Sequence, residues 1–140
     1  MKKNKNKIKI GFTCSAFDLL HAGHLLMLKE IRAQCDYLIV GLQTNPTIDR
    51  KEKHKPVESI KERRIRLEGC KYVDKVIIYK TESDLYKILK KLKPDIRFLG
   101  IDHKGKHFTG DDLNLKIVFN TRNHNYSSSN LIERIIKAYK

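Results

Sequence analysis

Short apolar runs alternate with helical patterns along the chain, and this alternation restricts the possible folds more than any other feature. Strands are expected at residues 8–14, 37–42, 75–79, 96–99 and 115–120. An order in which strands and helices alternate is typical of a parallel sheet covered by helices. The sequence therefore predicts an α/β fold in a single domain over residues 1–140. We expect a Rossmann-like, doubly wound, five-stranded parallel sheet with helices on both faces.

Helix signals lie between these strands. One helix is expected at 22–34, and a second begins at Ser59, where Glu62 completes a capping box. A third follows Thr81 and ends before Pro94. A fourth starts near Ser129. Two of these helices carry apolar residues along one face: Leu85, Ile88, Leu89 and Leu92 in the third, and Leu131, Ile132, Ile135, Ile136 and Tyr139 in the fourth.

The polar segments of the chain follow the predicted strands. In doubly wound sheets, ligands bind beyond the carboxyl ends of the strands, at the point where the strand order reverses. The octet at 17–24, the loop at 43–58, the loop at 101–112 and the segment at 122–129 all follow such ends. We therefore expect them to converge on one functional site.

The octet at 17–24 reads Phe-Asp-Leu-Leu-His-Ala-Gly-His, which places His21 and His24 at the opening of a helix. Unpaired backbone N–H groups and the helix dipole make such a position suitable for an anion. Gly23 leaves room for a ligand to approach the backbone. Two other interpretations stay open: ordinary surface histidines, or two ligands of a metal site. The metal interpretation needs a third ligand, such as Cys14 or Cys35.

The segment at 122–129 reads Arg-Asn-His-Asn-Tyr-Ser-Ser-Ser and leads into the last helix. Only one serine can cap a helix, so two hydroxyls and several backbone N–H groups are left for a ligand. Arg122 adds a guanidinium that can bind phosphate through two parallel hydrogen bonds. Taken alone, the segment favours a helix cap followed by a solvated loop.

The octet resembles the His-x-Gly-His signature of the cytidylyltransferase-like nucleotidyltransferases, most closely the small glycerol-3-phosphate cytidylyltransferases. The segment at 122–129 is similar to the second signature of that family, an arginine followed by hydroxyl residues that open a helix. The resemblance implies a transfer from CTP to a phosphorylated alcohol such as glycerol phosphate, with release of pyrophosphate. The alternatives are an adenylyltransferase that uses ATP and a sugar phosphate, and a non-catalytic module that binds nucleotide or nucleic acid.

The resemblance also implies roles for individual residues. His21, His24 and Arg122 are the expected catalytic residues, and Mg²⁺ is expected to bridge the phosphates of the nucleotide. Lys53, Lys55 and Arg63 are the expected ligands of the phosphorylated substrate. The residues expected to bind nucleotide are Ser15, Ala16, Phe17, Asp18, Gly23, His24, Gly100, Asp102, Arg122, Tyr126, Ser127, Ser128 and Ser129.

The formal net charge of +14 would suit a nucleic-acid partner, but the pattern of the charges favours small anionic ligands. Basic residues are spread along the chain and are not interleaved with aromatic residues that would stack on bases. We therefore expect no specific nucleic-acid partner. A nucleoside triphosphate and a phosphorylated co-substrate together account for part of the positive charge.

The remaining expectations concern location and assembly. No apolar stretch approaches the ~18 residues that a membrane span needs, and the basic start at 1–7 has no apolar segment after it that would make a secretory signal. Three cysteines without paired spacing suit a reducing, cytoplasmic environment. Small members of the family are typically homodimers, and a contact at 70–74 is expected here.

Overall fold

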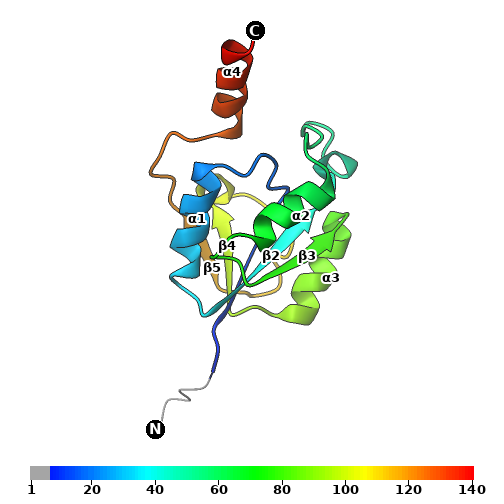
Figure 1. Cartoon of the computed structure of the whole chain (residues 1–140). Coiled ribbons are helices and arrows are strands. Elements are labelled where there is room, and N and C mark those ends of the chain that lie inside the picture. Colours follow the sequence, from blue (N-terminus) through cyan, green and yellow to red (C-terminus); the bar gives the residue numbers. More distant parts are fainter. Residues whose placement is uncertain (1–6) are drawn as a thin grey trace.

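The computed structural model describes residues 7–140, and these contain one five-stranded sheet (Figure 1). The strands pair in the order β3-β2-β1-β4-β5, and every pairing is parallel. The predicted fold class is therefore confirmed, and the strand order reverses between β1 and β4. The strands are β1 (Ile10–Ser15), β2 (Tyr37–Gln43), β3 (Lys75–Tyr79), β4 (Ile96–Gly100) and β5 (Ile117–Asn120).

The helices begin close to the predicted capping residues. Ser59 caps α2, with its hydroxyl oxygen accepting a hydrogen bond from the backbone N–H of Glu62, and Thr81 caps α3 in the same way. The helices are α1 (Ala22–Arg32), α2 (Ile60–Glu68), α3 (Glu82–Leu92) and α4 (Ser128–Ala138), with short 3₁₀ turns η1 (Pro46–Ile48) and η2 (Ile101–His103).

Apolar side chains form a core on each face of the sheet. On one face, Leu28 and Ile31 of α1 and Leu67 of α2 pack against strand residues such as Val40. On the other face the core is made by α3 together with strand residues and the loop before β5; its buried members are Phe12, Ile39, Tyr79, Leu85 and Leu89. Helices thus cover both faces, and the carboxyl ends of the strands are left for the loops.

Helix α4 stands apart from the rest of the molecule (Figure 1). An apolar stripe on a helix normally packs against a core, yet Ile135, Ile136 and Tyr139 are 46%, 56% and 86% exposed. The segment at 121–127 leaves the edge strand β5 and carries α4 beyond the N-terminal end of α1. The predicted apolar face exists, but none of its residues is buried.

The other differences from the sequence-based prediction lie at element ends. β1 begins two residues later than expected and β5 begins at Ile117, because Leu113 and Leu115 pack on the α3 side as part of a loop. Residues 1–6, most of the basic N-terminal segment, lie outside the described residues. No helix within 7–140 has the length and apolarity needed to cross a bilayer.

Candidate active site

His21 and His24 cap helix α1 reciprocally. His21 is the N-cap residue, and its Nδ1 accepts a hydrogen bond from the backbone N–H of Gly23 at 3.0 Å. The Nδ1 of His24 accepts one from the backbone N–H of His21 at 3.1 Å. A ring nitrogen that accepts a hydrogen bond carries no proton, so each neutral imidazole carries its hydrogen on Nε2. Both histidines can therefore offer an Nε2–H donor.

The surroundings of the two imidazoles keep them neutral. Burial lowers the pKa of His24 to about 4, and the neighbouring His21 acts in the same direction. Burial also lowers the pKa of His21, with further contributions from His124 and Arg122. At neutral pH the pair is therefore expected to supply hydrogen-bond donors without net charge.

Gly23 is required by the close packing around the histidine pair. A Cβ at this position would lie 2.8 Å from Cε1 of His124 and 2.9 Å from Cε1 of His21, closer than side chains tolerate. His124 is thus a third histidine at the site, and its Nδ1 accepts a hydrogen bond from the backbone N–H of Tyr126 at 3.1 Å. The sequence pattern predicts no role for His124, although this residue lies inside the segment at 122–129.

A cavity of about 370 Å³ opens beside this pair, and we call it the histidine cavity. It brings together the octet and the segment at 122–129, which are about a hundred residues apart in the sequence. The predicted residues that line it are Ser15, Phe17, His21, Gly23, His24, Gly100, Arg122, Tyr126, Ser127 and Ser128. Cys14, a possible metal ligand in the sequence, also lines it. The remaining lining residues have no predicted role: Thr13, Met27, His103, Asn120, Thr121 and His124.

The serines at the start of α4 have different positions. Ser127 is the N-cap, and its Oγ accepts a hydrogen bond from the backbone N–H of Asn130 at 3.1 Å. Ser128 begins the helix and lines the cavity, whereas Ser129 is exposed and lines neither of the two cavities described here. Arg122 donates to the backbone carbonyl oxygen of Tyr126 at 2.9 Å. One serine therefore caps the helix, as predicted, and the helix start faces the cavity.

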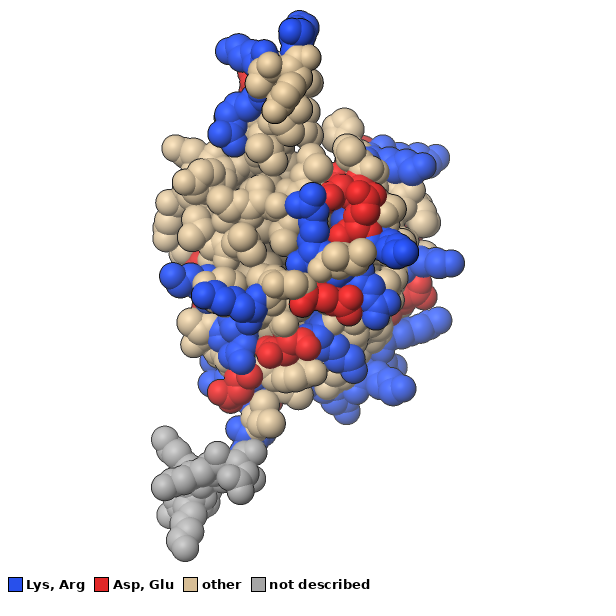
Figure 2. Space-filling view, viewed as in Figure 1, with Lys and Arg blue, Asp and Glu red and all other residues tan. Residues whose placement is uncertain are grey.

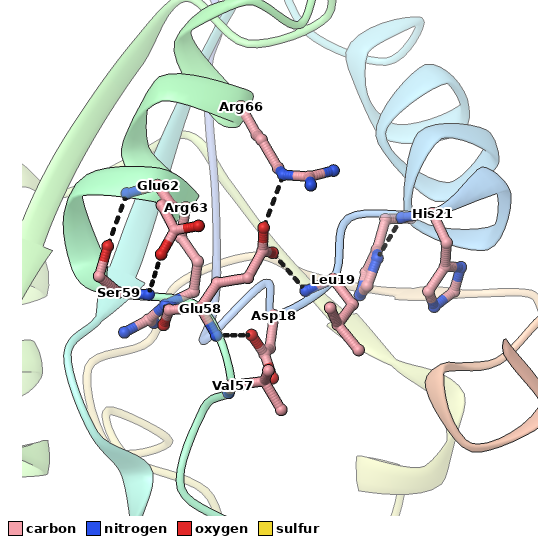
Figure 3. A network of polar contacts seen from close by, with 10 residues as sticks. Asp18, Leu19, His21, Val57, Glu58, Ser59, Glu62, Arg63 and Arg66 are labelled. Carbon is pink, nitrogen blue, oxygen red and sulfur yellow. Dashed lines mark hydrogen bonds and ion pairs between the residues drawn. The ribbon is translucent and has the colours of Figure 1, made fainter. Parts of the chain in front are cut away.

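The loop before His21 is held by two carboxylates (Figure 3). Asp18 accepts hydrogen bonds from the backbone N–H groups of Val57 and Glu58, and Glu58 accepts one from the backbone N–H of Leu19. Phe17 and Leu19 adopt φ angles of +47° and +50°, which are uncommon for residues with a Cβ. The carboxylate of Asp18 thus fixes this loop, and the expected contact of Asp18 with nucleotide stays a prediction.

Arg63 also differs from its prediction. It is 2% exposed, and four of its five N–H donors bond to backbone carbonyl oxygens of Glu58, Ala16, Gln43 and Thr44. It lines neither cavity. In this geometry the guanidinium of Arg63 joins the loops that follow β1 and β2, and its expected role as a substrate ligand stays a prediction.

A second cavity, of about 620 Å³, shares the wall formed by Cys14, Ser15 and His103 with the first. We call it the arginine cavity, after Arg50 and Arg97 in its lining. The residues that line it are Cys14, Ser15, Ala16, Gln43, Pro46, Arg50, Lys53, Tyr79, Glu82, Leu85, Arg97, Leu99, His103, His107, Phe108 and Thr109.

Four residues that were predicted to contact ligand do not line the histidine cavity. Lys53 and Ala16 line the arginine cavity and not the histidine cavity. Lys55 is exposed and lines neither cavity. Asp102 is exposed and also lines neither, although its Oδ1 lies 2.7 Å from the place of a Cβ on Gly100, which lines the histidine cavity. The expected contacts of Lys55 and Asp102 with ligand are therefore not supported by this geometry.

The histidine cavity is suited to an anion. Its lining contains Arg122 and four histidines but no aspartate or glutamate. The histidines are His21, His24, His103 and His124. The N-terminal ends of α1 and α4 add the positive ends of two helix dipoles. Within residues 7–140, no group of three His, Cys, Asp or Glu side chains is arranged to hold a metal ion, and Cys14, Cys35 and Cys70 are free thiols.

The wider surface carries basic residues in several separate groups. Figure 2 shows Lys and Arg side chains on this face of the molecule with Asp and Glu side chains between them. This mixture differs from a continuous basic surface that would follow a nucleic-acid backbone.

Comparisons with known proteins extend over nearly the whole chain. The family model described as "Cytidylyltransferase-like" matches residues 12–134. The chain is 35% identical over 132 residues to the bifunctional protein HldE of Campylobacter concisus and 34% identical over 133 residues to that of Caulobacter vibrioides. These matches cover 94% and 91% of this chain, but only 28% and 27% of the relatives. The chain thus spans little more than a quarter of their length.

One solved structure is similar over its full length. The lipopolysaccharide core biosynthesis protein from Thermoplasma volcanium GSS1 superposes with a TM-score of 0.70 at 28% identity, covering 84% of this chain and all of that one. The comparisons confirm the predicted family resemblance and the Rossmann-like fold. They do not confirm the predicted preference for CTP and glycerol phosphate.

Proposed function

This chain belongs to the cytidylyltransferase-like family of nucleotidyltransferases, and we propose that it transfers the adenylyl group of ATP to a sugar phosphate. An oxygen of the acceptor phosphate attacks the α-phosphorus in line. A new P–O bond forms, the bond from the α-phosphorus to the bridging oxygen breaks, and its electron pair leaves with pyrophosphate. The products are an ADP-sugar and pyrophosphate.

The reciprocal histidine cap is the observation that carries this proposal. It gives His21 and His24 a fixed tautomer, with Nε2–H donors next to the positive end of α1. Such donors stabilise negative charge that grows on phosphate oxygens during transfer. Because burial keeps His24 neutral, the donor stays in place over the physiological pH range and is not lost by titration.

The second group of residues in the histidine cavity suits the leaving pyrophosphate. Arg122 offers a planar guanidinium, and Ser127 and Ser128, at the start of α4, line the same cavity. Two helix starts that line one cavity can both contact a triphosphate. Positioning of this kind supplies much of the catalysis in phosphoryl transfer.

The lining of the histidine cavity bears on the expected magnesium ion. It offers no carboxylate oxygen, the ligand that Mg²⁺ commonly takes from proteins. A magnesium ion would therefore be coordinated by the triphosphate and water, and it would neutralise phosphate charge there. The roles proposed for the protein side chains do not depend on it.

The choice of nucleotide and acceptor is supported by the relatives. HldE proteins and a lipopolysaccharide core biosynthesis protein favour the sugar-phosphate adenylyltransferase over the glycerol-phosphate cytidylyltransferase. This proposal keeps the reaction class of the earlier prediction and changes its two substrates. CTP and glycerol 3-phosphate remain the comparison in the experiment.

The test is a screen for pyrophosphate release with each of four nucleoside triphosphates against sugar 1-phosphates, glycerol 3-phosphate and phosphocholine. We expect the highest rate with ATP and a sugar phosphate. A protein that binds ATP with no pyrophosphate release for any pair would be a binding module and would refute the proposal. Fastest turnover of CTP would restore the cytidylyltransferase alternative.

A further inference from the structure

The arginine cavity lies next to the histidine cavity, on the α3 side of the sheet. Its walls come from the ends of β1 and β2, the start of α3 and the loop at 103–109. Cys14, Ser15 and His103 form the boundary between the two cavities. A molecule in the arginine cavity can therefore reach a nucleotide in the histidine cavity across this boundary.

The walls of the arginine cavity contain polar atoms that the protein does not satisfy. Among residues 7–140, four buried side-chain polar atoms have no hydrogen-bond partner. Three of them, Nε2 of Gln43, Oε2 of Glu82 and Nε of Arg97, belong to residues that line this cavity. Buried polar atoms are nearly always paired in folded proteins. Their concentration around one cavity indicates partners that a ligand supplies.

Arg97 carries a positive charge that no carboxylate in the described chain neutralises. Its side chain is buried, at 2% exposure, and it forms none of the ion pairs present within residues 7–140. Its Nη1 donates to the backbone carbonyl oxygen of Thr109, and the guanidinium lies 5.2 Å from the centre of the Phe108 ring. A buried charge without a counter-ion is costly. An anionic ligand would remove that cost.

Two further cations lie around the same cavity. Arg50 and Lys53 line it, and its one carboxylate, Glu82, is already paired with Arg50 at 3.0 Å. Arg97 is close to the shared boundary, since it opposes the rise that burial causes in the pKa of the Cys14 thiol. Positive charge therefore extends to the boundary that a transferable phosphate must reach.

We propose that the arginine cavity binds the acceptor of the reaction as a polyhydroxylated phosphate, with its phosphate facing Arg97 and its hydroxyl groups facing Glu82 and Gln43. This inference rests on the proposed nucleotidyl transfer and names the residues that select the acceptor. A carboxylate oxygen in a phosphate site repels the ligand unless the ligand also carries hydrogen-bond donors. Sugar and polyol hydroxyls supply such donors.

The unpaired amide of Gln43 distinguishes hydroxyl groups from an ammonium group. Its Nε2 is a donor and needs an acceptor oxygen, which a hydroxyl provides and an ammonium lacks. Glu82 is paired with Arg50, so it has no free charge to neutralise a cationic ligand. The face of Phe108 is occupied by Arg97 and does not form an aromatic site for a quaternary amine. Sugar phosphates therefore fit better than phosphocholine.

Three variants test these assignments. Glu82→Gln and Gln43→Glu keep the shape of each side chain while exchanging an acceptor for a donor or the reverse, and Arg97→Lys keeps the charge but changes the guanidinium. The matched control is Glu52→Gln, since Glu52 is exposed and lines neither cavity. Each protein is assayed for the KM of ATP and of mannose 1-phosphate. Binding of mannose 1-phosphate alone is measured by calorimetry, and folding by thermal denaturation.

We expect each of the three variants to raise the KM and the Kd of mannose 1-phosphate about tenfold or more, the effect of one lost polar contact. The KM of ATP should change less than about twofold, and the control should match the wild type. Unchanged binding of mannose 1-phosphate in folded Glu82→Gln and Gln43→Glu would overturn the inference, even if Arg97→Lys does not fold. Preferred binding of phosphocholine would also overturn it.

The same measurements separate this inference from the proposed function. If the wild type releases no pyrophosphate from any substrate pair but still binds mannose 1-phosphate through these residues, the transfer reaction is refuted and the acceptor site is supported. If transfer occurs with a sugar phosphate and the cavity variants leave its KM unchanged, the acceptor site is refuted and the reaction is supported.

Discussion

Asp18 and Glu58 each hold the other's loop. The carboxylate of Asp18 accepts a hydrogen bond from the backbone N–H of Glu58 at 2.9 Å, and the carboxylate of Glu58 accepts one from the backbone N–H of Leu19 at 2.8 Å (Figure 3). Arg66 pairs with the second oxygen of Glu58 at 2.8 Å. This exchange joins the start of α2 to the loop that precedes His21, so a residue outside both cavities fixes the histidine cap.

Replacing Glu58 should therefore affect both stability and turnover. Glu58→Ala removes a charge-assisted hydrogen bond and frees a loop whose φ angles at Phe17 and Leu19 are uncommon. We expect a loss of about 2–4 kcal/mol in the free energy of unfolding, measured with urea, and a lower kcat. Glu68→Ala is the control, since that side chain is exposed and its ion pair with Arg64 should contribute well under about 1 kcal/mol. Equal stability of the two variants would contradict this role.

His24→Ala should lower kcat about 10²–10³-fold, the usual effect of losing one donor to a developing oxyanion, or about 2.7–4 kcal/mol. The Kd of ATP, measured by calorimetry, should change much less. His54→Ala is a suitable control, because His54 is exposed and lines neither cavity. Equal losses in ATP affinity and in kcat would mean that His24 contacts only the bound ground state.

The low pKa of His24 predicts a dependence of stability on pH. Its pKa of about 4 in the folded protein lies below its ordinary value near 6.5, so the unfolded chain binds the proton more tightly. The resulting stability is present above about pH 6.5 and is lost as pH falls toward 4. Urea denaturation at several pH values should show a loss of about 1–3 kcal/mol across this window. His24→Gln should flatten that slope, and an unchanged slope would contradict the assignment.

Local signals in the sequence predicted much of the fold and half of the site. The caps at Ser59 and Thr81 involve residues only three positions later, so a short stretch of sequence predicts them. The buried strands are predictable because they consist mostly of apolar residues. The octet at 17–24 and the segment at 122–129 were found because each is a continuous segment. Their convergence follows from parallel strands, whose carboxyl ends share one edge.

Interactions between distant residues were not predictable in this way. Arg63 lies in a basic helical run, which indicated a ligand or a solvated side chain. Its actual partners are backbone carbonyl oxygens 47 and 20 residues away, and a local pattern cannot predict them. Arg97 lies inside the apolar strand β4, where sequence gives no sign that its side chain enters a cavity. The path of residues 121–127 determines the position of α4. The apolar stripe on α4 does not predict that path.

Arg122→Lys should weaken ATP binding about tenfold while the net charge stays the same, because a lysine lacks the two-pronged geometry of the guanidinium. Ser128→Ala should have a milder effect, since the backbone N–H groups at the start of α4 remain. Arg64→Lys on the exposed side of α2 is the control for the same exchange. Calorimetric titration with ATP and CTP checks both variants. Wild-type affinity in Arg122→Lys would exclude this arginine from the phosphate site.

Assembly remains a prediction, and the structure changes where the contact is expected. In the predicted contact at 70–74, Cys70 is buried, and Tyr72 and Val73 are partly buried against the core. Helix α4 instead exposes Ile132 and Ile136, at 39% and 56%. We expect the dimer contact there.

Two copies of α4 packed antiparallel would cover this apolar face and place Glu133 of one chain near Arg134 or Lys137 of the other. Light scattering at micromolar concentration should then give about twice the chain mass of 16.4 kDa. The double variant Ile132→Glu and Ile136→Glu should give the monomer mass, and Lys90→Glu together with Lys91→Glu on exposed parts of α3 should stay dimeric as a control for added acidic charge. Because α4 begins at the histidine cavity, the monomeric variant should also bind ATP more weakly. A monomeric wild type would refute the predicted dimer.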